Sequence, residues 1–272
     1  MGLEQATYLD ASGVYIAKAL DKVGVAISLL QAWEPPEGYY LAFSGGKDSV
    51  AIYDLAVKAG VKFDAHYCVS PIDPPQIYKF IKEYYPDVIW DFHARGFWKM
   101  VDKKGLPMRQ RRWCCEIIKE AGGENRVVVT GNRRAEGNIR RNQCYVEKGI
   151  KTKRVYSLDL SKYVKEPSKM FIRPILDFDD YDIWQYQREN NLPYCSLYDE
   201  GFKRLGCVLC PFTNSTEREI AHFPKITNLW LLACNRITEA TKARGYTTLT
   251  GKPVKHHFEN GQELFDWWVA RK

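Results

Sequence analysis

The sequence predicts an α/β fold with an open, mostly parallel, doubly wound sheet and helical appendages at its N- and C-terminal ends. The first observation is that strand-length apolar runs alternate with stretches of helical periodicity, which is the pattern of parallel βαβ units. The second is that a glycine-rich turn connects the first run directly to a helix. The third is the length of 272 residues, which can bury the core of one large α/β domain. The strand-length runs are 39–43, 63–70, 88–93, 126–130 and 171–178.

The chain is organised around the strand 39–43, a turn, and a helix over 47–60. Two adjacent glycines in the turn let the backbone approach a ligand closely, and the N–H groups and dipole of the helix start favour an anion. Serine hydroxyls and one lysine suit a pyrophosphate. A tight turn with a serine cap is the alternative, but the gathering of these residue types in one turn favours the phosphate site. The residues of the turn are Ser44, Gly45, Gly46, Lys47, Asp48 and Ser49.

Residues after the later strands add to the predicted ligand-binding edge. Asp73 follows the strand 63–70, and an open α/β sheet binds ligands at the carboxyl ends of its strands. Asp73 could therefore contact a ribose or adenine, or it could cap a helix over 74–84. Gly131 ends the strand 126–130, and the arginines after it suit phosphate or sulfate oxygens, unless they form salt bridges on an exposed helix. These arginines are Arg133, Arg134, Arg140 and Arg141.

Other helices are expected to flank the sheet. An amphipathic helix over 11–33 would pack on the sheet or on a second subunit of a homo-oligomer. The polar, basic stretch 143–169 is expected to form a lid or an insertion over the site. The remaining predicted elements are a helix over 179–190, a helix over 216–243 with a break near Pro224, and a short helix over 263–269.

Composition is that of an ordinary globular protein, with 45% hydrophobic and 27% charged residues. No signal pattern opens the sequence and no apolar run could span a bilayer, so we expect a cytoplasmic protein with no membrane partner. The formal net charge of +7 is concentrated in three basic stretches. A polyanionic ligand would explain this excess, as would a nucleic acid or a solvated basic face. The basic stretches are 103–112, 133–141 and 151–169.

The chain has eight cysteines. In a cytoplasmic protein they are not expected to form a disulfide framework. An adjacent pair, Cys114 and Cys115, and a later Cys207-x-x-Cys210 instead indicate a metal or cluster site.

Several motifs, in order along the chain, resemble those of a known family. The turn 44–49 lacks the Gly-x-x-x-x-Gly-Lys-Ser/Thr pattern of a Walker A loop. It resembles the PP-loop of the ATP pyrophosphatase superfamily, whose members cut ATP between the α- and β-phosphates. From about 39 to 212 the chain resembles the cluster-bearing type of the phosphoadenosine phosphosulfate (PAPS) reductase family within that superfamily. The motifs are the turn, Asp73, Arg112-Trp-Cys-Cys115, Gly131-x-Arg-Arg-x-Glu136, and Asn191-Leu-Pro-Tyr-Cys-Ser-Leu-Tyr-Asp199 before Gly206-Cys-x-x-Cys210.

The resemblance implies an adenine nucleotide alpha-hydrolase-like fold in three parts. These are an N-terminal helical extension (1–38), a PP-loop nucleotide-binding domain with an iron–sulfur site (39–212) and a helical C-terminal region (213–272). It also implies a 4Fe-4S cluster, which four thiolates would hold. A four-cysteine zinc site is the alternative, although an adjacent pair of cysteines is unusual for zinc, and four unliganded thiols are a third reading. The matching cysteines are Cys114, Cys115, Cys207 and Cys210.

The sequence departs from the reductases of this family in two ways. Those reductases carry a C-terminal Glu-Cys-Gly motif whose cysteine attacks the sulfur of the substrate, whereas the last cysteine here is Cys234. Reductases also usually have an altered loop. The complete loop of this chain resembles that of relatives that adenylate a substrate, such as ATP sulfurylase small subunits and DNA phosphorothioation proteins.

We therefore expect, first, a transferase that binds ATP with Mg²⁺ and adenylates a substrate in sulfur-transfer chemistry, releasing pyrophosphate and AMP. A sulfur donor would take part, and the acceptor could be a nucleic acid. Residues 44–49, with Lys47 and Asp48 as catalytic residues, would hold the β- and γ-phosphates. The arginines would neutralise developing charge. The arginines that we expect in this role are Arg133, Arg134 and Arg140.

The second hypothesis is an oxidoreductase that reduces PAPS or adenylylsulfate to sulfite with a thioredoxin-like reductant. The thiol would then have to come from Cys144 or Cys195. The third is a cluster-bearing nucleotide sensor or accessory subunit with no catalytic activity. No recognisable nucleic-acid-binding module supports the third hypothesis.

Overall fold

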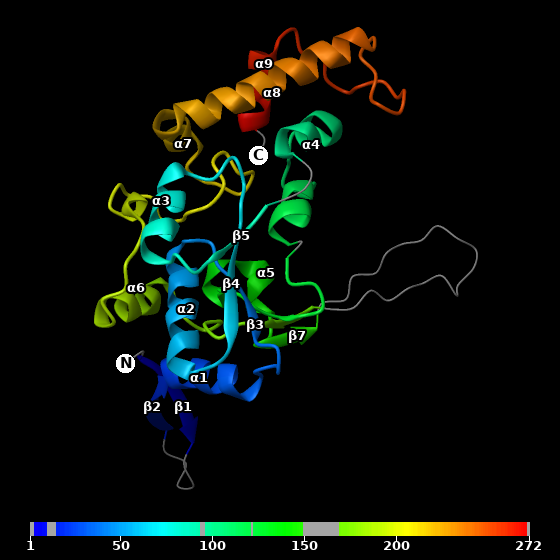
Figure 1. Ribbon diagram of the computed structural model, residues 1–272. Coiled ribbons are helices and arrows are strands. Elements are labelled where there is room, and N and C mark those ends of the chain that lie inside the picture. Colours follow the sequence, from blue (N-terminus) through cyan, green and yellow to red (C-terminus); the bar gives the residue numbers. More distant parts are fainter. Residues whose placement is uncertain (1–2, 10–14, 93–95, 121, 149–168, 271–272) are drawn as a thin grey trace, which may run out of the picture. The chain divides into compact units, whose positions relative to one another are not determined.

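The computed structural model describes residues 3–9, 15–92, 96–120, 122–148 and 169–270 (Figure 1). The chain forms two compact units, which we describe separately. The first unit contains the turn 44–49 and comprises residues 1–67, 76–91 and 123–205. The second unit contains both cysteine motifs and comprises residues 68–75, 92–122 and 206–272.

A six-stranded sheet lies in the first unit, with the strand order β5-β4-β3-β6-β8-β7. Strand β3 pairs in parallel with β4 on one side and with β6 on the other, and β6 pairs in parallel with β8. The edge strand β7 runs antiparallel to β8. This topology confirms the predicted α/β fold with a mostly parallel sheet. The strands are β3 (Tyr39–Ala42), β4 (Phe63–Cys68), β5 (Ile89–Asp91), β6 (Val127–Val129), β7 (Val146–Lys148) and β8 (Met170–Ile172).

The central strand β3 is buried because helices cover its side chains. Tyr39 and Leu41 are fully buried, and the Tyr39 hydroxyl donates a hydrogen bond to the carbonyl of Leu30 at 2.7 Å. Such an apolar run without alternation is typical of a parallel strand in an α/β sheet. At its end, the ring of Phe43 packs against those of Tyr53 and Tyr85 at centroid distances of 5.8 and 4.8 Å. These contacts fix the point at which the chain leaves the sheet.

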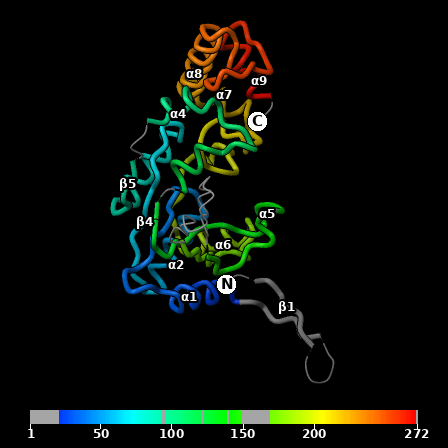
Figure 2. The backbone as a smooth tube through the Cα atoms, turned by 90° about the vertical axis from the view of Figure 1, so that its right-hand side faces the viewer, coloured from blue at the N-terminus to red at the C-terminus, as the bar shows by residue number. Residues whose placement is uncertain are grey.

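Helix α2 (Lys47–Ala59) follows β3 directly and packs against α1 and α6 (Figures 1 and 2). It ends where Gly60 adopts the left-handed conformation and donates its N–H to the carbonyl of Val57, which is a common helix C-cap. The predicted helix over 47–60 is therefore confirmed. The other helices of the first unit are α1 (Lys22–Ala32), α3 (Pro75–Tyr84), η2 (Arg134–Glu136), α5 (Asn138–Arg141), α6 (Asp180–Glu189) and η4 (Ser196–Tyr198).

The described part of the second unit is mainly helical. The long helix α8 begins at Pro224, so the predicted break at this proline is confirmed. Helices α8 and α9 lie side by side in both views (Figures 1 and 2) because the buried rings of Trp230 and Trp268 pack at a centroid distance of 4.6 Å. The helices are α4 (Phe97–Lys104), the π-helix η1 (Cys115–Lys119), α7 (Thr216–His222), α8 (Pro224–Ala243) and α9 (Gly261–Ala270).

Two predicted elements differ from the structure. The helix expected over 11–33 begins only at Lys22, because the Asp21 carboxylate caps α1 by accepting the N–H of Gly24 at 2.9 Å. Before this helix, β1 (Leu3–Leu9) and β2 (Tyr15–Asp21) form an antiparallel strand pair.

The strand expected over 171–178 stops at Ile172, since Arg173 and Pro174 follow and a proline cannot donate to a ladder. Of the stretch predicted to be a lid, residues 149–168 lie outside the described residues. No helix in the described ranges is long and apolar enough to cross a membrane.

Candidate functional site

The turn 44–49 joins the carboxyl end of β3 to the first turn of α2, as the sequence predicted. Gly45 has a φ of +70°, and a Cβ atom at this position would lie 3.0 Å from Ile77 and 3.2 Å from Ile81 of α3. Only glycine avoids both the backbone strain and the clash. Gly46 is the N-cap of α2 and provides no side chain to bind the free N–H groups of the helix. The first turn of α2 therefore presents backbone donors.

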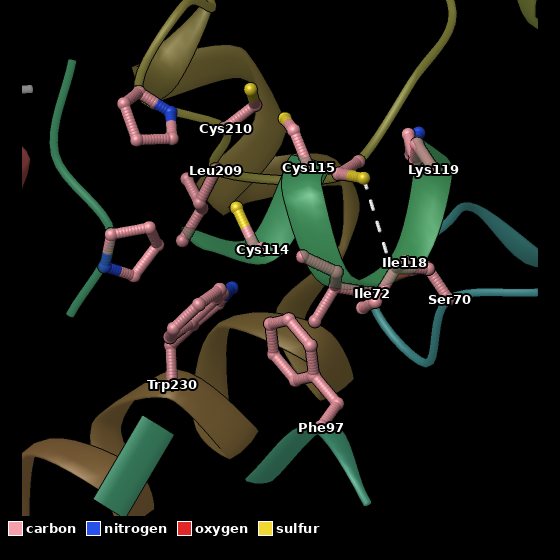
Figure 3. A pocket seen from close by; sticks show the side chains of 13 residues that line it. Ser70, Ile72, Phe97, Cys114, Cys115, Ile118, Lys119, Leu209, Cys210 and Trp230 are labelled. Carbon is pink, nitrogen blue, oxygen red and sulfur yellow. Dashed lines mark hydrogen bonds between the residues drawn. The ribbon is translucent and has the colours of Figure 1, made fainter. Parts of the chain in front are cut away.

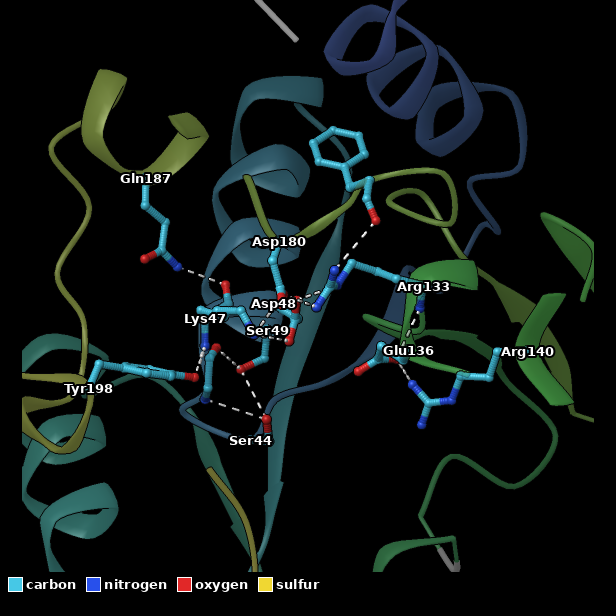
Figure 4. Close-up of polar contacts among 12 residues, drawn as sticks. Ser44, Lys47, Asp48, Ser49, Arg133, Glu136, Arg140, Asp180, Gln187 and Tyr198 are labelled. Atoms are coloured by element: carbon cyan, nitrogen blue, oxygen red, sulfur yellow. Dashed lines mark hydrogen bonds and ion pairs between the residues drawn. The ribbon is translucent and has the colours of Figure 1, made fainter. Parts of the chain in front are cut away.

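Hydrogen bonds within the turn and from α6 and η4 hold its shape (Figure 4). Ser49 Oγ donates to the carbonyl of Gly46 at 2.8 Å and lies 3.2 Å from Ser44 Oγ. The Lys47 N–H donates to the Tyr198 hydroxyl at 2.9 Å, and Gln187 Nε2 donates to the Lys47 carbonyl at 2.8 Å. Both polar groups of the Lys47 backbone are thus bound by side chains from distant parts of the chain.

Two buried cations, Lys47 and Arg133, and two carboxylates, Asp48 and Asp180, lie together at this turn (Figure 4). Lys47 and Arg133 are 5% and 3% exposed. Arg133 Nε lies 2.7 Å from Asp48 Oδ1, and Arg133 Nη2 lies 2.7 Å from Asp180 Oδ1. Lys47 Nζ lies 3.3 Å from the same Asp180 oxygen and 3.6 Å from Asp48 Oδ2. Although burial raises it, these two cations hold the pKa of Asp180 below its usual range.

Gly131 lets the end of β6 approach the start of α2. A Cβ atom on Gly131 would lie 3.2 Å from Cβ and 3.3 Å from the carbonyl carbon of Asp48, which is tighter than ordinary packing. The absence of a side chain here brings the segment after β6 close to the turn, and Arg133 lies two residues later. A role for Gly131 in binding a ligand stays a prediction.

The three predicted arginines do not share one environment. Arg133 is the one beside the turn, whereas Arg134 forms an ion pair with Asp177 and lies over the ring of Tyr145. Arg140 forms an ion pair with Glu136 (Figure 4). A charge-neutralising role for Arg134 or Arg140 would require these pairs to open and stays a prediction.

Sequence reasoning did not single out three residues that the structure brings to the turn. Asp180 and Gln187 come from α6, and Tyr198 comes from η4. Tyr198 lies in the Asn191–Asp199 motif, which pointed to this segment without assigning the residue a role. Burial raises the pKa of Tyr198, so its hydroxyl stays protonated at neutral pH. Nothing in the spacing of Asp180 and Gln187 predicted their contacts, because these depend on how α6 packs against α2.

In the second unit, all four predicted cysteines line one pocket. Cys114, Cys115 and Cys210 line this pocket together with the rings of Trp230 and Phe97 (Figure 3). Cys207 also lines this pocket, and its sulfur lies 4.0 Å from Ser70 Oγ. Across the described residues, however, no three or more histidine, cysteine, aspartate or glutamate side chains are arranged to hold a metal ion. The thiols share a pocket without converging on one point.

The Cys207-x-x-Cys210 turn has a fixed backbone. Leu209 has a φ of +59°, an uncommon conformation for a branched residue, and its N–H donates to Glu219 Oε2 at 2.6 Å. The Val208 N–H donates to the carbonyl of Ile72 at 2.7 Å. These bonds support the turn that presents the two cysteines.

The two adjacent thiols differ in acidity. Hydrogen bonding from Cys114 lowers the pKa of Cys115 to about 6 against the effect of burial, and the Arg112 guanidinium lowers it further. The same hydrogen bond and burial raise the pKa of Cys114. Burial and the nearby Asp73 carboxylate raise the pKa of Cys207. A thiolate is therefore favoured at Cys115, and thiolates are the form that binds iron or zinc.

Asp73 belongs to the second unit, where its Oδ1 lies 3.7 Å from Lys119 Nζ. The predicted contact with a ribose or adenine stays a prediction. Of the two cysteines proposed as nucleophiles, Cys144 is exposed and Cys195 is buried. Burial raises the pKa of Cys195, which leaves its thiol protonated at neutral pH.

The chain is similar in sequence to two uncharacterized proteins of Methanocaldococcus jannaschii. Each is 29% identical over 70% of this chain, and the chain spans 46% and 40% of their lengths. The chain thus covers less than half of either archaeal relative.

Two further relatives carry the names of enzymes. A probable FAD synthase of Schizosaccharomyces pombe is 28% identical over 64% of this chain and 60% of its own length. Adenosine 5′-phosphosulfate reductase 1 of Bacillus subtilis is 24% identical over 62% of this chain and 71% of its own length. Among solved structures, the FMN adenylyltransferase of Candida glabrata is 18% identical over 76% of this chain and 77% of its own, with a TM-score of 0.48.

The family model of the phosphoadenosine phosphosulfate reductase domain matches residues 38–213, which is more than half of the chain. This range begins just before β3, contains the turn 44–49 and ends after Cys210. The chain therefore belongs to the phosphoadenosine phosphosulfate reductase domain family.

Proposed function

We propose that the chain binds ATP at the turn 44–49 and transfers its adenylyl group to an acceptor, in sulfur-transfer chemistry. The observation that carries this proposal is the burial of Lys47 and Arg133 at the start of α2, beside a turn whose positive φ and close packing at Gly45 favour glycine. Two desolvated cations next to free helix N–H groups favour a polyphosphate more than a single carboxylate. The complete Ser-Gly-Gly-Lys-Asp-Ser loop resembles those of ATP-using relatives.

In adenylation, an oxygen of the acceptor forms a bond to the α-phosphorus while the bond to the α,β-bridging oxygen breaks. The electron pair leaves with pyrophosphate, and the proton of the acceptor passes to solvent. Negative charge therefore builds up on the leaving pyrophosphate, where Lys47, Arg133 and the N-terminus of α2 would stabilise it. A sulfur nucleophile would then attack the carbon that bears the adenylated oxygen, a carbon–sulfur bond would form as the carbon–oxygen bond breaks, and the electron pair would leave with AMP, so no electrons are gained or lost overall.

Mg²⁺ is a proposed cofactor that would supply neutralising charge to the triphosphate. Mg²⁺ prefers carboxylate oxygens, and Asp48 provides one within the turn. A 4Fe-4S cluster is a second proposed cofactor. Four cysteines line one pocket and cluster sites are built from four thiolates, which supports the proposal, although binding would require the four thiols to converge. The residues that would hold the cluster are Cys114, Cys115, Cys207 and Cys210.

The test compares nucleotide turnover by Lys47→Ala and Lys58→Ala. Both lysines belong to α2, but Lys58 pairs with Asp54 at the other end of the helix and serves as the control. We expect ATP binding by calorimetry, and AMP and pyrophosphate when an acceptor is present, from the Lys58 variant and not from the Lys47 variant. FMN is one acceptor to include, because one relative is named a probable FAD synthase. Equal ATP binding by the two variants would contradict the proposal.

The cluster needs its own measurement. Anaerobic purification should give a brown protein with about four irons per chain, as a four-thiolate cluster requires. Cys207→Ser should lower the iron content, whereas Cys68→Ser, a cysteine outside the two motifs, should leave it unchanged. A colourless protein with one zinc per chain would contradict the assignment.

A second candidate is reduction of adenylylsulfate or PAPS to sulfite. It is favoured by the names of several relatives, among them the Bacillus subtilis reductase. A cysteine thiolate would bond to the sulfur while the sulfur–oxygen bond to the nucleotide breaks, and an external dithiol would then release sulfite. Cys144 is the exposed candidate for this thiol. Formation of sulfite with thioredoxin, lost in Cys144→Ser, would establish this reaction instead of adenylation.

A further inference from the structure

The group of charges at the turn contains one member that is open to solvent. The side chains of Lys47 and Arg133 are 6% and 3% exposed and that of Asp48 is 23% exposed, whereas the side chain of Asp180 is 74% exposed. A single oxygen, Asp180 Oδ1, lies within 3.3 Å of Lys47 Nζ and 2.7 Å of Arg133 Nη2. An exposed carboxylate therefore bridges the two buried cations that we assign to the phosphates.

The four side chains carry no net charge together, because two cations face two carboxylates. A polyphosphate that entered this group would meet a neutral site and a carboxylate already bonded to its partners. If Asp180 turned outward, the group would keep a net charge of +1 and one oxygen position would become free at both cations. The Asp180 side chain is 74% exposed, so solvent is available to it when it turns outward. Asp48, by contrast, lies in the first turn of α2 and packs against Gly131.

We propose that Asp180 is an internal competitor of the phosphate groups, which neutralises Lys47 and Arg133 in the empty site and leaves them when a polyphosphate binds. This inference rests on the proposed function of the turn 44–49. It makes Asp180 a residue that sets the affinity for polyphosphate rather than one that helps to hold it. The lowered pKa of Asp180 supports the charged form that such competition requires.

Two other roles for Asp180 predict different behaviour. As the first residue of α6, its carboxylate could simply stabilise the helix by interacting with the positive end of the helix dipole. The helix already has the capping box formed by Asp179 and Asp182, so this need is met without Asp180. Alternatively, Asp180 could hold Mg²⁺ together with Asp48, in which case its removal would weaken binding of a magnesium-bound ligand.

The test measures the affinity of the whole chain for inorganic pyrophosphate by calorimetry, with EDTA and with Mg²⁺. The variant is Asp180→Asn, which keeps the size of the side chain and removes its charge. The control is Glu189→Gln, which removes one exposed charge from the far end of the same helix. Asp180→Glu keeps the charge and should bind as the wild type does. Thermal melting of all four proteins verifies that they are folded.

We expect Asp180→Asn to bind pyrophosphate about two- to fivefold more tightly in EDTA, since an exposed ion pair is worth up to roughly this factor. The gain should shrink at high salt, which screens the competing charge. Equal or weaker binding by Asp180→Asn would overturn the inference while leaving the phosphate site intact, and weaker binding only with Mg²⁺ would identify a metal ligand. Absence of binding by every variant and the wild type would overturn the proposed function as well.

Discussion

Replacing Tyr198 by phenylalanine tests how the turn 44–49 is held. The substitution removes one hydroxyl and keeps the ring, which packs edge-on against Trp184 at a centroid distance of 4.9 Å. It takes away the acceptor that the Lys47 N–H binds at 2.9 Å. An N–H left without its partner in a largely buried position costs about 1–3 kcal/mol. For a chain of this size, we expect the melting temperature to fall by roughly 2–10 °C.

The assay combines urea unfolding with hydrogen exchange measured on the peptide that contains residues 44–50. The exchange of the Lys47 amide should accelerate in Tyr198→Phe, which is a local effect that a general loss of stability would not confine to this peptide. Tyr194→Phe is the matched control, because its hydroxyl bonds to Asp199 at an exposed position of the same segment. Unchanged exchange over 44–50 in Tyr198→Phe would refute the reasoning.

Two further predictions concern the first unit. Gly45→Ala should lower the free energy of unfolding by at least about 1–2 kcal/mol, because alanine disfavours the positive φ of this position. Gly46 has no positive φ, so Gly46→Ala should cost less. Urea unfolding of the two variants measures the difference. Asp64→Asn tests a pH dependence: burial raises the pKa of Asp64, but hydrogen bonds from Arg126 and His66 lower it on balance. Because the pKa of Asp64 is lower in the folded than in the unfolded chain, the ionised carboxylate stabilises the fold at pH values above the unfolded pKa of about 4. This stabilisation is lost as the pH falls through the folded-state pKa. The stability difference between wild type and Asp64→Asn should thus be larger at pH 7 than at pH 3, and an equal difference would contradict this account.

The sequence predicted those features that depend on neighbours along the chain. The strand, turn and helix around Gly45 and Gly46 were predicted because hydrophobic pattern, glycines and helix start all lie within about twenty residues. The predicted strand extended too far beyond Ile172 because the apolar residues after Pro174 resemble a strand in the sequence. In the structure they pack in a turn and do not pair in a ladder. The helix start was misplaced because the pattern over 11–33 continues through residues that pair as strands.

Contacts between distant segments could not be predicted in this way. Gln187 and Tyr198 are 140 and 151 residues away from Lys47 in the sequence, and their partners are backbone atoms, which carry no side-chain signature. The different ion pairs of Arg133 and Arg134 could not be predicted either. Two adjacent arginines have the same chemistry, and their partners Asp48 and Asp177 are known only from the structure.

The binding of the Lys47 backbone by late segments has a consequence for synthesis of the chain. Strand β3 and helix α2 leave the ribosome early, but Gln187 and Tyr198 are added about 140 to 150 residues afterwards. At a synthesis rate of roughly 5–20 residues per second, the two residues that hydrogen-bond to the turn are added about 7–30 seconds after it. The turn 44–49 therefore receives both contacts only after α6 and η4 have been synthesised, among the last parts of the first unit.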